Sequence, residues 1–148
     1  MSGYAFEDFP VGTCLQSGVV EVTKESIIQF AERFDPQPFH LDPGTAKKTI
    51  FGGLAASGWQ TAALSMRLFV DTMNVTGGII GMGVDDLRWP NPVRPGDQLQ
   101  LEIEIADARF SKSRPGFGII RVRNVTRNQR QEIVQSFSAS AMLPGRQS

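Results

Sequence analysis

Residues 57–73 read SGWQTAALSMRLFVDTM, the longest helix-like apolar segment of the chain. Nine of the fifteen residues in positions 59–73 are apolar. The polar residues Gln60, Arg67 and Asp71 form only a narrow stripe. A helix that is apolar around most of its circumference is normally buried. We therefore predict a long helix over residues 59–73, enclosed in the middle of the protein.

After this helix the sequence changes to a period of two. Leucine or isoleucine occupies positions 99, 101, 103 and 105, and glutamine or glutamate occupies the positions between them. This alternation is typical of a half-buried strand. The turn residues that separate the later segments are few, and strands joined by short turns are antiparallel. We predict antiparallel strands over residues 79–89, 99–105, 117–125 and 133–142.

The part of the chain before residue 57 holds one more strand and two further helices. Residues 13–22 are compatible with a strand. Thr23 suits a helix N-cap, and apolar residues then recur at helical spacing up to Phe34, where Asp35-Pro36 ends the pattern. Asp42 followed by proline predicts a short helix through Lys48. Together these elements predict an α+β protein, an antiparallel sheet around one buried helix.

Length and composition limit the possible domain organisation, partners and functions of the protein. The 148 residues suit one domain, taken as 1–148, and no internal repeat or linker divides them. Fifteen basic and fifteen acidic residues leave no net charge, which argues against nucleic acid as a partner. The lone Cys14 cannot form an intramolecular disulfide, and no Cys/His cluster predicts a metal site. With no signal peptide and no apolar run long enough for a bilayer, we expect a cytoplasmic protein without a membrane partner.

His40 is the only histidine, and it lies five residues after Asp35. An extended segment would separate the two by roughly 17 Å, but the prolines between them favour a turn that brings the side chains together. Imidazole titrates near neutrality, and a carboxylate can orient it or exchange protons with it. The alternative is structural: Asp before Pro often ends a helix, and a lone His in a loop is often a hydrogen-bonded structural residue.

Ser57 and Gly58 begin the predicted buried helix. The unpaired N–H groups of a helix start, with the positive end of the helix dipole, favour an anion or a developing oxyanion. Ordinary capping by Ser57 and tight packing at Gly58 explain the same residues. Trp59 and Trp89 are expected in the core or at an interface. Arg88, Arg94, Lys112 and Arg114 are expected to be solvated cations.

Three segments match motifs of one known family: Asp35-x-Gln37-Pro38-Phe39-His40-x-Asp42-x-x-x-Ala46, the run from Phe51 to Gly58, and Trp89-x-x-Pro92-Val93-x-Pro95-Gly96-Asp97-x-Leu99. Together they resemble the (R)-specific enoyl-CoA hydratases and other MaoC-like dehydratases, over residues 4–142. The chain differs in having Gln37 where Asn is usual, Ser57 where many members have His, and Phe34 where Gly is usual. The resemblance implies a hot-dog fold, with the sheet wrapped around the long helix.

The resemblance also implies a reaction, the reversible addition of water to a trans-2-enoyl thioester to give an (R)-3-hydroxyacyl thioester. By this analogy Asp35 and His40 activate the water and deliver a proton to C2, and the Gly58 N–H polarises the thioester carbonyl. Substrate-binding positions are Gln37, Phe51 and Ser57. No metal or redox cofactor is needed, because CoA or an acyl-carrier pantetheine arrives with the substrate.

Two other functions remain open on the same fold. A hot-dog thioesterase would need a carboxylate on the long helix, and residues 58–67 contain no Asp or Glu. A non-catalytic acyl-CoA-binding subunit would not need both Asp35 and His40. Because a hot-dog sheet has exposed edges that commonly pair with a second copy, we expect a homodimer or a higher homo-oligomer.

Overall fold

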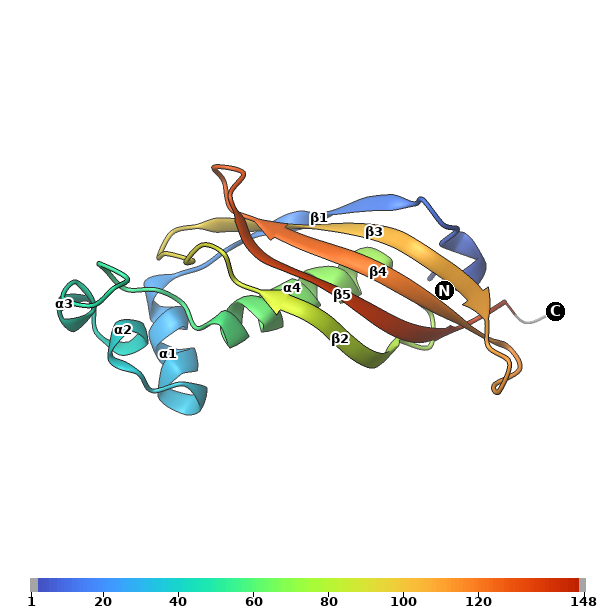
Figure 1. Cartoon of the computed structure of the whole chain (residues 1–148), viewed down its shortest axis with the longest axis horizontal. Helices are drawn as coiled ribbons and strands as arrows, with labels where there is room; N and C mark the ends of the chain where they lie inside the picture. Colours follow the sequence, from blue (N-terminus) through green and yellow to red (C-terminus); the bar gives the residue numbers. More distant parts are fainter. Residues whose placement is uncertain (1–2, 147–148) are drawn as a thin grey trace.

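One five-stranded antiparallel sheet forms the body of the protein, as a computed structural model of the chain shows (Figure 1); the structure describes residues 3–146. Its strand order is β1-β3-β4-β5-β2, and every neighbouring pair is antiparallel. The sheet contains β1 (Cys14–Glu21), β2 (Ile80–Arg88), β3 (Gln98–Phe110), β4 (Phe117–Arg127) and β5 (Ile133–Pro144). All the predicted strands are confirmed, and β3 runs five residues beyond the predicted end at residue 105.

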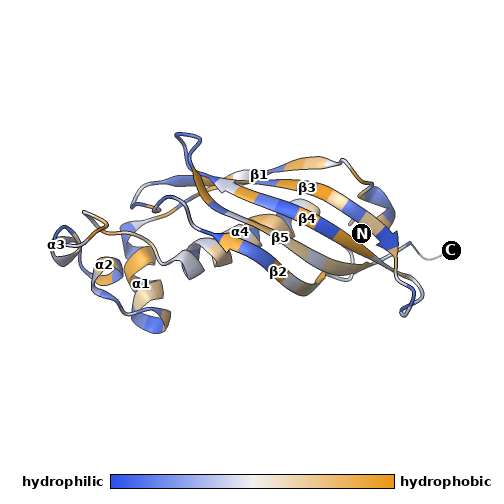
Figure 2. Ribbon diagram, viewed as in Figure 1, coloured by the Kyte–Doolittle hydropathy of each residue, from blue (hydrophilic) through white to orange (hydrophobic). Residues whose placement is uncertain are grey.

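The long helix α4 (Gly58–Met73) lies across one face of this sheet (Figure 1). Ser57 caps it, with its hydroxyl accepting a hydrogen bond from the Trp59 N–H, and Asn74 ends it in the left-handed region at φ 47°. Leu68, Phe69 and Met73 pack on the inward residues of β3 and β4, which alternate with polar residues along the first half of β3 and the middle of β4 (Figure 2). The α+β class and the hot-dog arrangement of sheet and helix are therefore confirmed.

Three helices gather at one end of the molecule, beside the start of α4 (Figure 1). They are α1 (Lys24–Phe34), α2 (Pro38–Leu41) and α3 (Pro43–Ala46), and a 3-10 turn, Phe6–Asp8, lies near the start of the chain. Thr23 caps α1 and Asp42 caps α3, as predicted. The sequence did not predict α2. No helix within residues 3–146 has the length and apolar character needed to cross a membrane.

The prediction that α4 is enclosed on all sides is wrong for the single chain. Gln60 and Ser65 face inward, because Gln60 donates to the Ser26 hydroxyl at 3.2 Å and Ser65 shares a 2.7 Å hydrogen bond with Thr126. Buried polar groups with such partners are tolerated. The apolar side chains Trp59, Met66 and Val70 are instead more than half exposed. Ile80, Met82 and Val84 of the edge strand β2 are also more than half exposed.

Candidate active site

A tight turn between α1 and α2 brings Asp35 and His40 together. The Gln37 N–H donates to the Asp35 carbonyl at 2.8 Å, and the His40 N–H donates to the Gln37 carbonyl at 2.9 Å. As a result the His40 Nε2 lies 3.4 Å from the Asp35 Oδ2. His40 is only 5% exposed, while the Asp35 side chain keeps 19% exposure. The turn therefore creates a largely buried acid/base pair at the end of the molecule where α1, α2 and α3 gather.

The hydrogen bond on the other side of the imidazole fixes its tautomer. His40 Nδ1 lies 2.6 Å from the Ala55 carbonyl oxygen. A carbonyl oxygen can only accept, so Nδ1 carries the proton and neutral His40 presents a lone pair on Nε2. The rings of Phe39 and Phe51 pack around the imidazole, with centroids at 4.7 and 6.1 Å. The proton-accepting nitrogen therefore points toward Asp35.

Two neighbours hold the Asp35 carboxylate. The Gln37 amide donates to Oδ1 at 2.5 Å, and the Ser57 hydroxyl donates to Oδ2 at 2.7 Å. Partial burial opposes ionisation, but these hydrogen bonds and the nearby His40 together lower the pKa of Asp35 below its ordinary value. Ser57 is fully buried behind the carboxylate. It therefore contacts Asp35 and the start of α4, and it presents no surface to a substrate. Gln37 is exposed, with its amide nitrogen engaged on Asp35.

A cavity of about 360 Å³ opens in front of His40. Gly58 lies in its wall, and no hydrogen bond within residues 3–146 occupies the Gly58 N–H. A Cβ at Gly58 would come within 2.5 Å of the Trp89 ring, so this close approach requires glycine. Phe51 also lines the cavity. The structure thus places the His40 side chain and a helix N-terminal N–H without a hydrogen-bond partner in the described part of the chain around one cavity.

Several residues of this cavity could not be predicted from the sequence. Trp89 is part of its wall, not of the core, and its Nε1 donates to the Gln135 side chain at 2.8 Å. Thr61 and Asn91 also line it. Trp89 opens the Trp-x-x-Pro-Val motif, which was the only signal in the sequence that connected it to the site.

Arg94 has a structural role that the sequence did not indicate. Its guanidinium donates to the carbonyls of Gly53 at 2.9 Å, Leu54 at 3.2 Å and Phe51. The expectation that Arg94 is a solvated cation is therefore wrong. Lys112 and Arg114 lie in the turn between β3 and β4, at the opposite end of the molecule from α2 (Figure 1).

Several known proteins resemble this chain in sequence and fold. The family model described as "MaoC like domain" matches residues 9–127. The crystal structure of a MaoC-like dehydratase from Rhodospirillum rubrum superposes with a TM-score of 0.93 at 46% identity, covering 99% of this chain and 100% of that chain. The unliganded R-hydratase PhaJ1 from Pseudomonas aeruginosa gives a TM-score of 0.80 at 25% identity, with coverage of 96% and 86%. The uncharacterized protein YdeM of Bacillus subtilis is 33% identical over 138 residues, 93% of this chain and 96% of YdeM.

Proposed function

The chain belongs to the MaoC-like domain family, and from this membership we propose that it adds water reversibly to trans-2-enoyl-CoA, giving (R)-3-hydroxyacyl-CoA. The observation that carries the proposal is the His40 Nε2 lone pair 3.4 Å from the Asp35 carboxylate. Similarity to a dehydratase and to an R-hydratase supports the same reaction class. The CoA or acyl-carrier pantetheine is part of the substrate, and the reaction uses no separate cofactor, metal ion, nucleic acid or membrane.

The pair is suited to hold a water molecule. Neutral His40 Nε2 and the Asp35 carboxylate are both acceptors, so no proton lies between them directly. A water that donates one hydrogen to each leaves its own lone pair free to attack C3. Because the pKa of Asp35 is lowered, the carboxylate stays ionised and orients this water. His40 is then the group that accepts the proton.

These groups alone account for every bond and proton that changes in the hydration. The water oxygen forms a bond to C3, the C2=C3 electron pair moves toward the thioester carbonyl, and His40 Nε2 takes the water proton. The Gly58 N–H stabilises the developing enolate oxygen, a contribution of about 3–4 kcal/mol for one such donor. The imidazolium, stabilised by Asp35, then returns its proton to C2 on the same face. Dehydration follows the reverse order.

Thioester hydrolysis receives less support from the same geometry. The only carboxylate of α4 is Asp71, which is exposed and paired with Arg67 at 2.9 Å. It lies near the end of the helix, far from Gly58. A purely acyl-binding role would leave the buried, tautomer-fixed His40 without a task.

The test is the loss of enone absorbance when a trans-2-enoyl-CoA is added, followed by chiral analysis of the product. We expect wild-type turnover with an (R)-3-hydroxyacyl product, and losses of about 10²–10⁴-fold in His40→Ala and Asp35→Asn. Glu104→Gln, which changes an exposed carboxylate on the outer sheet face, is the matched control and keeps full activity. Full activity in His40→Ala, or release of free thiol in place of hydration, would rule out the proposal.

We further propose that the protein pairs with a second copy of itself. The unpaired edge of β2 offers a surface for this contact, with Ile80, Met82 and Val84 each more than half exposed. Exposed apolar edges promote strand pairing between chains. We expect a two-fold homodimer joined along β2, which light scattering measures directly. A monodisperse monomer at assay concentration would contradict this arrangement.

A further inference from the structure

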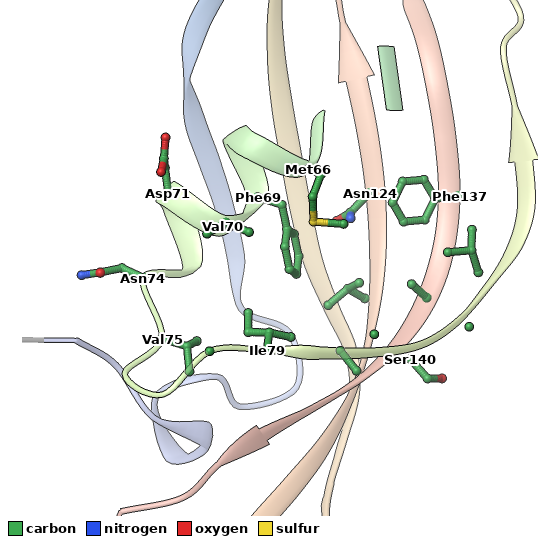
Figure 3. A pocket seen from close by; sticks show the side chains of 17 residues that line it. Met66, Phe69, Val70, Asp71, Asn74, Val75, Ile79, Asn124, Phe137 and Ser140 are labelled. Atoms are coloured by element: carbon green, nitrogen blue, oxygen red, sulfur yellow. The ribbon is translucent and has the colours of Figure 1, made fainter. Parts of the chain in front are cut away.

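A second cavity, of about 560 Å³, lies between α4 and strands β2 and β5 (Figure 3). Its walls are mostly apolar, with Met66, Phe69 and Val70 from the helix and Phe137 from β5. Asn124, from β4, lies among them (Figure 3). Ligand cavities of this size typically combine apolar walls with a few polar groups that fix orientation.

Asn124 is the unusual member of this wall. It is only 5% exposed, and no donor within residues 3–146 lies at hydrogen-bonding distance from its Oδ1. Its neighbours across the sheet are the apolar residues Ile103 and Phe137. A buried acceptor without a partner is rare and costs about 1–3 kcal/mol.

The other polar residues around this cavity are already engaged or lie in solvent. Asp71 is paired with Arg67 at 2.9 Å, and the Ser140 hydroxyl accepts from Arg121 at 3.0 Å. Asn74 is exposed at the end of α4. Asn124 is therefore the buried amide that remains available to a molecule in the cavity.

The second cavity lies farther along α4 and β5 than the catalytic cavity does, and the two share no lining residue among residues 3–146. Gly58 and Thr61 line the catalytic cavity, and Met66 and Phe69 line the second one. On β5, Val134 lines the catalytic cavity and Phe137 lines the second one. At 1.5 Å per residue, Gly58 and Met66 are about 12 Å apart along the axis. An acyl chain whose thioester lies at Gly58 can therefore extend toward Asn124.

We propose that this second cavity receives the far end of the acyl chain, and that Asn124 there binds a hydroxyl group of the substrate. The inference rests on the proposed hydratase function and adds the substrate class. A hydroxyl can both donate to Oδ1 and accept from Nδ2, so it satisfies the amide in either orientation. A carboxylate is disfavoured, because the described cavity wall contains no Lys or Arg and its one charged residue is Asp71.

The experiment compares kcat/KM for trans-2-enoyl-CoA pairs of equal chain length, one plain and one with a terminal hydroxyl, over a series of lengths. Wild type should prefer the hydroxylated chain by about fivefold or more at the length that reaches Asn124, the discrimination expected for one buried hydrogen bond. Asn124→Leu should remove this preference while still hydrating the plain chain. It should also raise the Tm without ligand, because an unpartnered amide is replaced by an apolar group of similar size. A lower Tm would indicate a structural role and overturn the inference.

Thr126→Val is the matched control. It removes another buried polar group two residues along the same strand, outside the cavity wall, and should keep the hydroxyl preference. Hydration of plain chains with no preference in wild type overturns this inference alone, even if Asn124→Leu fails to fold. No hydration of any chain overturns the proposed function itself.

Discussion

Replacing Ser57 by alanine should damage the active site and the fold at once. The Ser57 hydroxyl donates to Asp35 Oδ2 at 2.7 Å and accepts from the Trp59 N–H at 3.3 Å. Losing an N-cap costs about 0.5–2 kcal/mol. Losing a hydrogen bond to a charged group costs about 1.5–3 kcal/mol. Because one substitution removes both, we expect a decrease of about 2–5 kcal/mol in the free energy of unfolding at neutral pH.

Ser57→Gly separates the two contributions. Glycine at an N-cap costs only a few tenths of a kcal/mol, but it also lacks the hydroxyl that holds Asp35. If Ser57 only capped the helix, Ser57→Gly would be close to wild type in stability and activity. If the Asp35 contact matters, both variants should lose about tenfold or more in kcat/KM, equivalent to about 1.4 kcal/mol.

The pH dependence gives a second measurement. The folded pKa of Asp35 lies below its ordinary value of 3.8, so its carboxylate contributes stability above that value and loses it as pH falls through the folded pKa. Removing the Ser57 hydrogen bond raises the folded pKa. The stability deficit of Ser57→Ala should therefore be largest at neutral pH and shrink under acid conditions, below about pH 4. The acid limb of kcat/KM should move to higher pH. An unchanged pH profile with wild-type activity in both variants would refute this account of Ser57.

Three further changes test the surroundings of the site. Gly58→Ala places a Cβ within 2.5 Å of the Trp89 ring, so we expect a lower Tm and a large loss of kcat. The double variant Gly58→Ala/Trp89→Leu should recover part of both; no recovery would show that the clash with Trp89 is not the cause. Arg94→Lys cannot reproduce the forked contact with three carbonyls, and hydrogen exchange should therefore become faster in residues 51–56; unchanged exchange would contradict a clamping role. Val84→Asp places charge on the exposed edge of β2 and should shift the expected dimer to monomer in light scattering, while an intact dimer would locate the interface elsewhere.

The sheet and the helix caps were predictable because their signals are local. The alternation along β3 and the Thr23 and Asp42 caps each involve neighbours within a few residues. The inward orientation of Gln60 and Ser65 was not predictable in this way. Their partners, Ser26 and Thr126, lie 34 and 61 residues away in the sequence. An apolar-stripe argument assigns such polar residues to solvent, since it cannot include a partner that only the fold supplies.

The candidate site also combines residues that local signals predict with contacts that only the fold supplies. The motif identifies Asp35 and His40, and the prolines between them indicate a turn. The groups that give each residue its chemical state come from elsewhere: Ala55 fixes the tautomer of His40, and Ser57 holds Asp35. Trp89 was interpreted as a core or interface residue because the sequence gives no sign that its ring lies against Gly58.

A single segment, residues 51–58, unites these contacts. Its Ala55 carbonyl orients the imidazole, its Ser57 hydroxyl orients the carboxylate, and its Gly58 lines the cavity. Arg94 binds the first part of the segment, and the Ala56 N–H donates to the Val93 carbonyl at 2.9 Å. A shift of this segment would therefore disturb the contacts of His40 and Asp35 and the position of the Gly58 N–H together. For the proposed hydration, which depends on the relative positions of these groups, the segment held by Arg94 matters as much as His40, which carries the proton, and Asp35, which orients the water.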